Sequence, residues 1–216
     1  MVADELGFIH RFEAGEGPDR PPLLLLHGTG GSEDDLVPFA RSAAPGAALL
    51  SPRGRVREGE MARFFRRLAE GVFDHEDVRR RAHELADFVL AAGREYGLTR
   101  PIALGYSNGA NIAAALLYLR PEVLAGAVLL RAMVPLEDPP AERLHDRPVL
   151  LLSGKSDPII AADNAARLAR TLVEAGAPVR HEVLAAGHGL TQDDFALTRA
   201  WLAEVGPNGP GDGHAA

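Results

Sequence analysis

Cysteine is absent from this chain of 216 residues, and its absence excludes several kinds of chemistry. The chain can form no disulfide framework, offer no thiolate nucleophile and give no sulfur ligand to zinc or to an iron–sulfur cluster. Its fold must therefore rest on an apolar core. With 46% hydrophobic and 25% charged residues, we expect one domain over residues 1–205. Residues 206–216, rich in glycine and proline, are expected to form a flexible tail.

Positive charge is also scarce. Lys155 is the only lysine, and 23 basic residues face 30 acidic ones, for a formal net charge of −7. A protein of this charge repels the phosphates of nucleic acids and the head groups of anionic membranes. We therefore expect neither a nucleic acid nor a membrane among its partners.

Long apolar runs are lacking as well. Crossing a bilayer takes about 18 to 20 apolar residues, whereas Arg120 and Arg131 interrupt the longest candidate segments. The first residues, MVADELGFIHRF, carry acids where a secretory signal carries positive charge. We expect a soluble, cytoplasmic protein.

What the chain does contain is a regular alternation of short apolar runs with longer segments of helical period. The apolar runs cover residues 23–27, 47–51, 101–106, 124–132 and 147–153. The helical segments cover residues 33–44, 76–96, 108–120, 162–175 and 191–204. Strands that are apolar throughout need cover on both faces, which a parallel sheet between helices provides. The pattern predicts an α/β fold with a mostly parallel, doubly wound sheet, an opening strand at residues 7–14 and a weaker strand starting at residue 179.

The connections between these elements predict how open a site would be. In such a sheet, ligands bind beyond the carboxyl ends of the strands, where the long connections lie. The one large insertion covers residues 52–75, and the connection over residues 133–146 is too short for a lid. We therefore expect no separate cap domain, and a shallow, open site.

A GxSxG pattern, GYSNG at residues 105–109, directly follows an apolar strand and directly precedes a helix. A sharp strand-to-helix turn of this kind exposes its serine, and the flanking positions must be glycine because a Cβ would collide with the backbone. With six serines and 23 glycines, chance alone would produce the pattern roughly 0.07 times in this chain. The context predicts that Ser107 is a nucleophile.

A nucleophilic serine needs a histidine base and a carboxylate that orients the base, in the chain order Ser, Asp, His for this type of turn. Asp157 lies in the loop after a later strand, which suits the carboxylate, although it could also be a turn or helix-capping residue. Asp138 lies too early, in a proline-rich loop, and Asp163 is placed like the start of a helix. Among eight histidines, His188 follows the last strand between two glycines, and it is the predicted base.

The loop at residues 27–31, HGTGG, also follows a strand. We expect its Thr29 backbone N–H and that of Asn108 to form an oxyanion hole. A phosphate-binding loop is the alternative, but no GK[ST] sequence follows and the dinucleotide spacing is absent. No motif for a metal, nucleotide or flavin is visible, so we expect no cofactor and no metal.

The insertion at residues 52–75 is rich in arginine and phenylalanine. Its phenylalanines, Phe64, Phe65 and Phe73, are predicted to line a substrate pocket, with a place in the core as the equal alternative. An arginine could meet an anionic substrate group. We favour internal pairing for most of the arginines, with Glu58, Glu60 and Glu70 as partners.

Five segments together resemble one enzyme family. They are HGTGGSEDDLVPFA from His27, SPRGRVREGEMARFFRRLAEGVFDHEDV from Ser51, GYSNGANIAAALL from Gly105, SGKSDPII from Ser153 and AGHGLTQDD from Ala186. They are similar to the small phospholipase/carboxylesterase family of α/β hydrolases, especially its bacterial hydroquinone-associated carboxylesterases and more distantly acyl-protein thioesterases. The similarity extends from residue 22 to residue 201.

This resemblance implies a catalytic domain of the α/β-hydrolase fold without a cap. It implies Ser107, Asp157 and His188 as the catalytic triad, with Thr29 and Asn108 as oxyanion donors, and it allows a homodimer. One departure stands out, because the relatives that resemble acyl-protein thioesterases usually have leucine at the position of Thr29.

The function we expect is a serine carboxylesterase that hydrolyses small acyl or aryl esters through an acyl-enzyme on Ser107. Its partner would be a small-molecule ester. The same triad could serve a thioesterase or lysophospholipase, cofactor-free perhydrolysis or carbon–carbon bond cleavage. A different class of function is a ligand-binding module without turnover on the same scaffold, because fold alone does not determine function.

Overall fold

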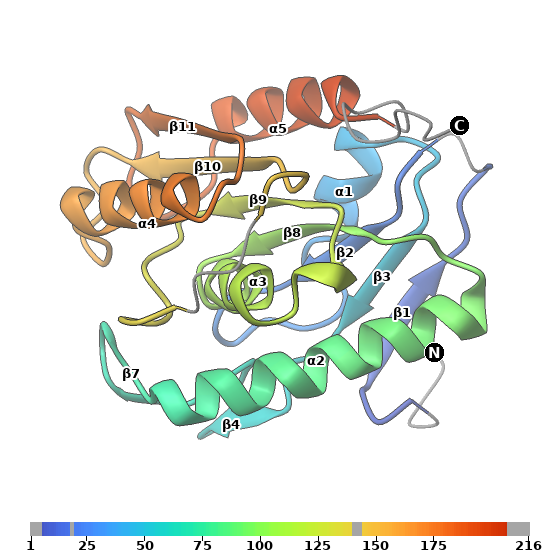
Figure 1. Ribbon diagram of the computed structural model, residues 1–216, viewed down its shortest axis with the longest axis horizontal. Coiled ribbons are helices and arrows are strands. Elements are labelled where there is room, and N and C mark those ends of the chain that lie inside the picture. The colour runs from blue at the N-terminus through green and yellow to red at the C-terminus, as the bar shows by residue number, and fades with distance from the viewer. Residues whose placement is uncertain (1–5, 18–19, 140–143, 207–216) are drawn as a thin grey trace.

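The computed structural model describes residues 6–17, 20–139 and 144–206, and its centre is a seven-stranded sheet between two layers of helices (Figure 1). In spatial order the strands are β1 (His10–Glu13), β3 (Leu49–Pro52), β2 (Leu23–Leu26), β8 (Ile102–Tyr106), β9 (Gly126–Leu130), β10 (Val149–Gly154) and β11 (Val179–Leu184). Within the described chain, β1 is the one antiparallel strand of this sheet. The predicted mostly parallel, doubly wound sheet is confirmed.

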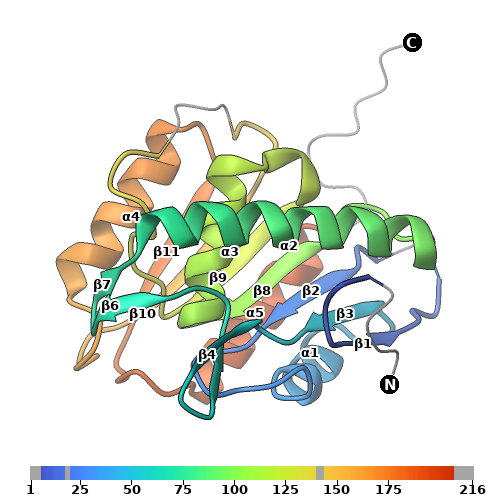
Figure 2. The same ribbon diagram turned by 90° about the horizontal axis from the view of Figure 1, so that it is seen from below.

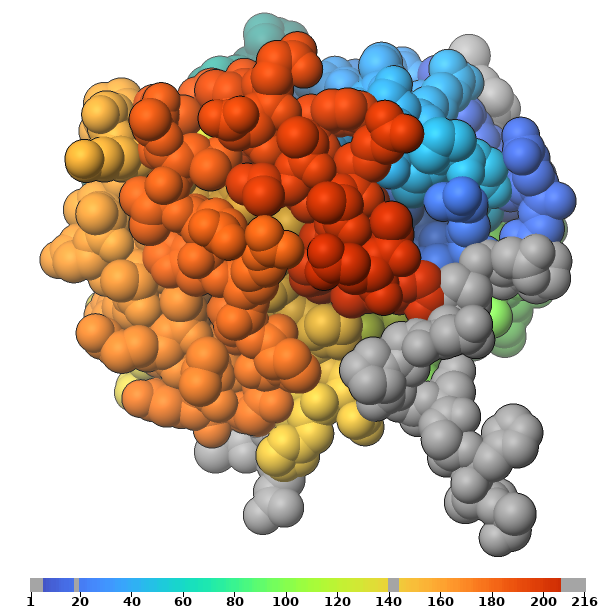
Figure 3. All heavy atoms as spheres, turned by 90° about the horizontal axis from the view of Figure 1, so that it is seen from above, coloured from blue at the N-terminus to red at the C-terminus, as the bar shows by residue number. Residues whose placement is uncertain are grey.

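The sheet is covered on both faces, as its apolar central strands require. All residues of β2, β9 and β10 are buried. Helices α2 (His75–Tyr96), α3 (Asn108–Leu119) and α4 (Ala162–Glu174) lie on one face of the sheet, and α1 (Val37–Ala43) and α5 (Gln192–Glu204) lie on the other. Figure 3 shows the molecule from the side of α1 and α5. A short 3₁₀ helix, η1 (Pro121–Val123), follows α3. Each face has its own cluster of buried apolar side chains.

Four helices begin and end within one residue of the predicted positions, whereas the helix expected over residues 33–44 is shorter and begins at Val37. Pro38 lies in its first turn, where a missing N–H costs no helical hydrogen bond. Glu33 lies before the helix and accepts two hydrogen bonds from Arg53. No helix in the described part of the chain has both the length and the apolar character that crossing a bilayer takes.

The insertion at residues 52–75 contains four short strands that the sequence did not predict. Strands β4 (Val56–Glu58) and β5 (Met61–Arg63) form one antiparallel pair, and β6 (Arg67–Ala69) and β7 (Val72–Phe73) form another. Figure 2 shows β6 and β7 beside the start of α2. Two hydrogen bonds hold the insertion against the loop after β2 and the start of α3, since Gly30 N donates to Ala62 O at 2.9 Å and Phe64 N donates to Asn108 Oδ1 at 2.8 Å.

Internal pairing holds for three of the six arginines of this insertion, Arg63, Arg66 and Arg67. Arg53 and Arg55 pair instead with Glu33 and Glu84 outside it. Arg67 pairs with the predicted Glu58 at 2.6 Å. Arg66 pairs instead with Asp74, the residue that caps the start of α2.

Candidate active site

Ser107 lies in a sharp turn between β8 and α3, in a backbone conformation that side chains rarely adopt. Its φ is 52° and its ψ is −114°. A Cβ on Gly105 would lie 2.6 Å from the carbonyl oxygen of Gly109, and a Cβ on Gly109 would lie 1.9 Å from that of Leu26. Backbone packing around the serine therefore requires both glycines of the GxSxG pattern.

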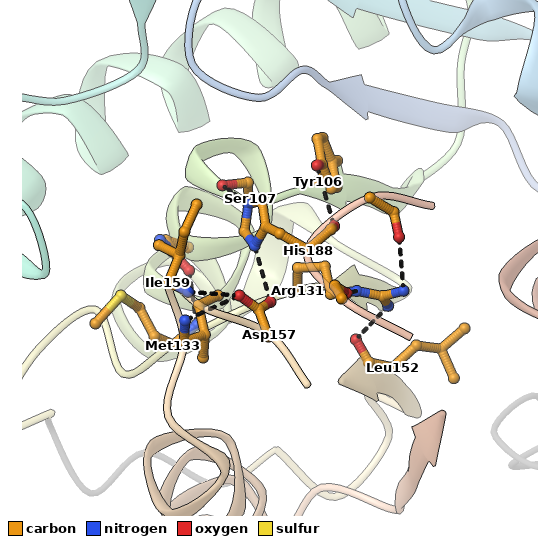
Figure 4. Close-up of polar contacts among 12 residues, drawn as sticks. Tyr106, Ser107, Arg131, Met133, Leu152, Asp157, Ile159 and His188 are labelled. Atoms are coloured by element: carbon orange, nitrogen blue, oxygen red, sulfur yellow. Dashed lines mark hydrogen bonds and ion pairs between the residues drawn. The ribbon is translucent and has the colours of Figure 1, made fainter. Parts of the chain in front are cut away.

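The structure brings Ser107, Asp157 and His188 together from three separate segments of the chain (Figure 4). His188 Nε2 lies 3.0 Å from Ser107 Oγ, and His188 Nδ1 lies 2.8 Å from Asp157 Oδ2. Because an ionised carboxylate can only accept, Nδ1 carries the proton and Nε2 is free to accept from the serine hydroxyl. The arrangement can pass a proton from the serine to the histidine.

Asp157 occupies the turn after β10, and its side chain is 1% exposed. Burial alone would raise the pKa of its carboxyl. Hydrogen bonds from His188 and from the backbone N–H groups of Ile159 and Ile160 lower that pKa further than burial raises it. Asp157 is therefore a carboxylate at neutral pH. Its Oδ1 accepts from the backbone of the turn, and its Oδ2 accepts from His188.

Arg131 is a residue of this site that the sequence did not reveal, beyond interrupting an apolar run. It follows β9 with a φ of 55°, and its side chain is fully buried. Its guanidinium donates to the carbonyl oxygens on both sides of His188, from Nε to Gly187 at 2.8 Å and from Nη2 to Gly189 at 3.1 Å. These two hydrogen bonds fix the loop that carries His188 to the end of β9.

The charge of Arg131 is balanced by Asp194 in the first turn of α5, through bonds of 2.6 and 2.8 Å. Asp194 also accepts from the N–H and the hydroxyl of Thr191, which completes the cap of that helix. On the other side of the loop, Tyr106 Oη donates to the carbonyl oxygen of His188 at 3.1 Å (Figure 4). The charged residue at the end of a buried strand was the one sequence signal for this network.

Thr29 and Asn108, the predicted oxyanion donors, lie in the loop after β2 and at the first position of α3. Within the described residues, neither of their backbone N–H groups donates to a protein acceptor. Their side chains are held in place, because Arg63 Nη1 donates to Thr29 Oγ1 at 2.7 Å and Asn108 Oδ1 accepts from Phe64 N.

His27 holds the loop of Thr29 against the insertion. Gly54 N donates to His27 Nε2 at 3.0 Å, so the other ring nitrogen, Nδ1, carries the proton that binds Gly28 O at 2.6 Å. Burial lowers the pKa of His27, since a buried imidazolium would lose its hydration. The ring is neutral at pH 7 and keeps this pair of bonds.

The three phenylalanines of the insertion differ in how deeply they are buried. Phe64 and Phe65 are 3% and 0% exposed and pack in the main core, which is the alternative that the sequence left open. Phe73 is half-buried, and its ring centre lies 4.9 Å from that of Phe65. Phe73 also packs against this core, and its place in a pocket stays a prediction.

Several known proteins are similar to this chain in sequence and fold over most of its length. No protein-family model matches it. MhqD of Bacillus subtilis (strain 168), which bears the name of a hydrolase, is 43% identical over 198 residues, covering 91% of this chain and 98% of MhqD. The Bacillus cereus carboxylesterase structure has a TM-score of 0.89 at 42% identity and covers 91% of this chain and 93% of its own. A carboxylesterase from Mesorhizobium loti has a TM-score of 0.89 at 33% identity, with 94% and 98% covered. The chain belongs to the carboxylesterase family of α/β hydrolases.

Proposed function

We propose that this protein is a serine carboxylesterase with Ser107 as nucleophile, His188 as general base and Asp157 as the orienting carboxylate. The observation that carries the proposal is the continuous hydrogen-bond chain from Ser107 Oγ through both ring nitrogens of His188 to Asp157 Oδ2. Carboxylesterases among its relatives support an ester as the substrate.

In the first half of the reaction, Ser107 Oγ attacks the ester carbonyl carbon while its proton passes to His188 Nε2. Asp157 stabilises the imidazolium that forms. The tetrahedral intermediate then collapses, the bond to the alcohol breaks, and the imidazolium returns the proton to the leaving oxygen. An acyl-enzyme on Ser107 remains.

In the second half, His188 takes a proton from water, which attacks the acyl carbon. The bond to Ser107 Oγ breaks as the serine regains its proton, and the carboxylic acid leaves. In both halves the negative oxygen would lie between the backbone N–H groups of Thr29 and Asn108. Each such donor contributes about 3 to 4 kcal/mol of transition-state stabilisation.

Small acyl or aryl esters are the substrates we propose. Two exposed apolar side chains near the catalytic residues support this choice, namely Ile159 at 45% and Met61 at 40% exposure. Ile159 follows Asp157 by two residues, and Met61 packs next to Gly30 in the loop of Thr29. They offer apolar contact for a short group without enclosing a long tunnel.

The test is steady-state hydrolysis of p-nitrophenyl esters from acetate to palmitate by the wild type and by Ser107→Ala. We expect kcat/KM to peak at short chains and to fall at least about a thousandfold in the variant, because the nucleophile is removed. Equal activity in the variant would remove Ser107 from this role. One acylation without further turnover would favour a binding module.

A further inference from the structure

The insertion at residues 52–75 contains a surface depression that none of the three triad residues lines. The depression, of about 570 Å³, lies between β4, β5 and β6 and has charged and apolar walls. The apolar wall consists of Val56, Leu68 and Ala69, and the charged groups are Arg57, Arg63, Arg66, Arg67, Glu58 and Glu70. Four cations thus face two carboxylates here, although the whole chain carries a net charge of −7.

The ion pairs in this depression leave positive charge in excess. Glu58 is shared, with Arg67 at 2.6 Å and Arg63 at 3.5 Å. Arg57 has no carboxylate within ion-pair distance in the described chain and donates to the backbone oxygen of Glu60 at 2.9 Å. Arg66 is balanced by Asp74 outside the depression. With Asp74 included, the surroundings carry about one uncompensated positive charge.

Arg63 connects this charge to the catalytic centre. Its side chain is 3% exposed, and its Nη1 binds the hydroxyl of Thr29, whose backbone N–H is the proposed oxyanion donor. Its Nε binds Phe65 O at 3.2 Å, and its Nη2 has no hydrogen-bond partner among the described residues. Burial and the nearby Arg67 both lower the pKa of Arg63, as expected of a cation with too little counter-charge.

We infer that this depression is a subsite for a carboxylate carried by the ester substrate, with Arg63 and Arg57 as its cationic contacts. The inference rests on the proposed function and narrows its substrate class to half-esters of dicarboxylic acids, in which the free carboxylate lies a few bonds from the scissile carbonyl. A guanidinium fork matches a carboxylate in shape and charge. The single uncompensated charge fits this monoanion better than a phosphate dianion.

The experiment compares p-nitrophenyl hydrogen glutarate with its neutral methyl ester, p-nitrophenyl methyl glutarate. We expect the wild type to hydrolyse the charged ester with about tenfold higher kcat/KM, since a charge-assisted hydrogen bond is gained. Arg63→Met should bring this ratio close to one, and Arg57→Gln, at an exposed position, should lower it severalfold. Glutarate should also inhibit hydrolysis of the neutral ester at lower concentration than inorganic phosphate.

The matched control is Arg55→Gln, which removes one positive charge from the same insertion. Arg55 lies over the Phe8 ring and near Glu84, outside the depression, so the ratio should stay at the wild-type value. Equal hydrolysis of both esters by the wild type would overturn the subsite while leaving the esterase intact. Stronger inhibition by phosphate would overturn the carboxylate assignment, and failure to hydrolyse either ester would overturn the proposed function together with the subsite.

Discussion

Arg131 shows how one buried side chain connects the sheet, a helix and the catalytic histidine. Its guanidinium contacts the loop on both sides of His188 and forms an ion pair with Asp194 in which both side chains are 0% exposed. A buried charge without its partner is costly, because neither water nor a counter-ion stabilises it. The stability of the fold and the position of the histidine therefore depend on the same side chain.

For Arg131→Met we expect a loss of about 3 to 5 kcal/mol in the free energy of unfolding, because Asp194 is left buried and charged. Adding Asp194→Asn removes that charge and should restore part of the stability. The double variant should still have a low kcat, since Gly187 and Gly189 remain without their donor. Urea unfolding and steady-state kinetics measure the two effects, and a wild-type kcat in the double variant would leave Arg131 only a structural role.

His27 makes the stability of the protein sensitive to mild acid. Its pKa is lowered in the folded state by burial, so the unfolded chain binds a proton more readily. The contribution of His27 to stability is fully present above its pKa in the unfolded chain, near 6.5. It declines as the pH falls from there toward the pKa of His27 in the folded protein. The slope would be at most about 1.4 kcal/mol per pH unit.

Urea unfolding of the wild type and His27→Gln between pH 5 and 8 measures this contribution. We expect a shallower acid-side decline in the variant, because glutamine does not titrate. The pKa of His181 is lowered by burial too, so His181→Gln is the parallel measurement for that residue. An unchanged slope in His27→Gln would show that His27 does not govern the decline.

Two helices each contain a glycine, but only one of these glycines is required by its surroundings. In α3, a Cβ on Gly109 would lie 1.9 Å from Leu26 O, whereas in α2 a Cβ on Gly93 would make an ordinary contact of 3.5 Å with Leu98 O. Gly93→Ala should raise the free energy of unfolding by about 0.5 to 1 kcal/mol, because alanine favours helix.

Gly109→Ala should instead prevent stable folding or displace the serine turn, with loss of ester hydrolysis. Thermal unfolding and activity of the two variants give the comparison. A stable and active Gly109→Ala protein would contradict the close packing of α3 on β2.

The elements differed in how well the sequence predicted them. Central strands such as β2 and β10 and four of the helices were found because apolar runs and helical period arise from burial itself. The opening strand is shorter than the predicted residues 7–14, and β4 to β7 were missed. These two- and three-residue strands depend on pairing across the insertion, which leaves no periodic signal in so few residues.

For the whole molecule, residues at the ends of strands were predictable because the fold class brings the carboxyl ends of parallel strands to one edge. Ser107, Asp157 and His188 follow three such strands, and the structure places their side chains within hydrogen-bond distance. The sequence alone could not reveal Arg131 or decide the place of Phe64 and Phe65. Whether a charge is balanced or a ring is covered depends on neighbours that are distant in the sequence.

The most direct test of the account is to locate the acyl group during turnover. The wild type would be mixed with p-nitrophenyl acetate, quenched in acid within the first turnovers, digested and mapped by mass spectrometry, with Ser107→Ala treated in parallel. We expect one acetyl group on Ser107 in the wild type and none in the variant. An acetyl group on another residue of the wild type, or equal hydrolysis by the variant, would contradict the proposed mechanism.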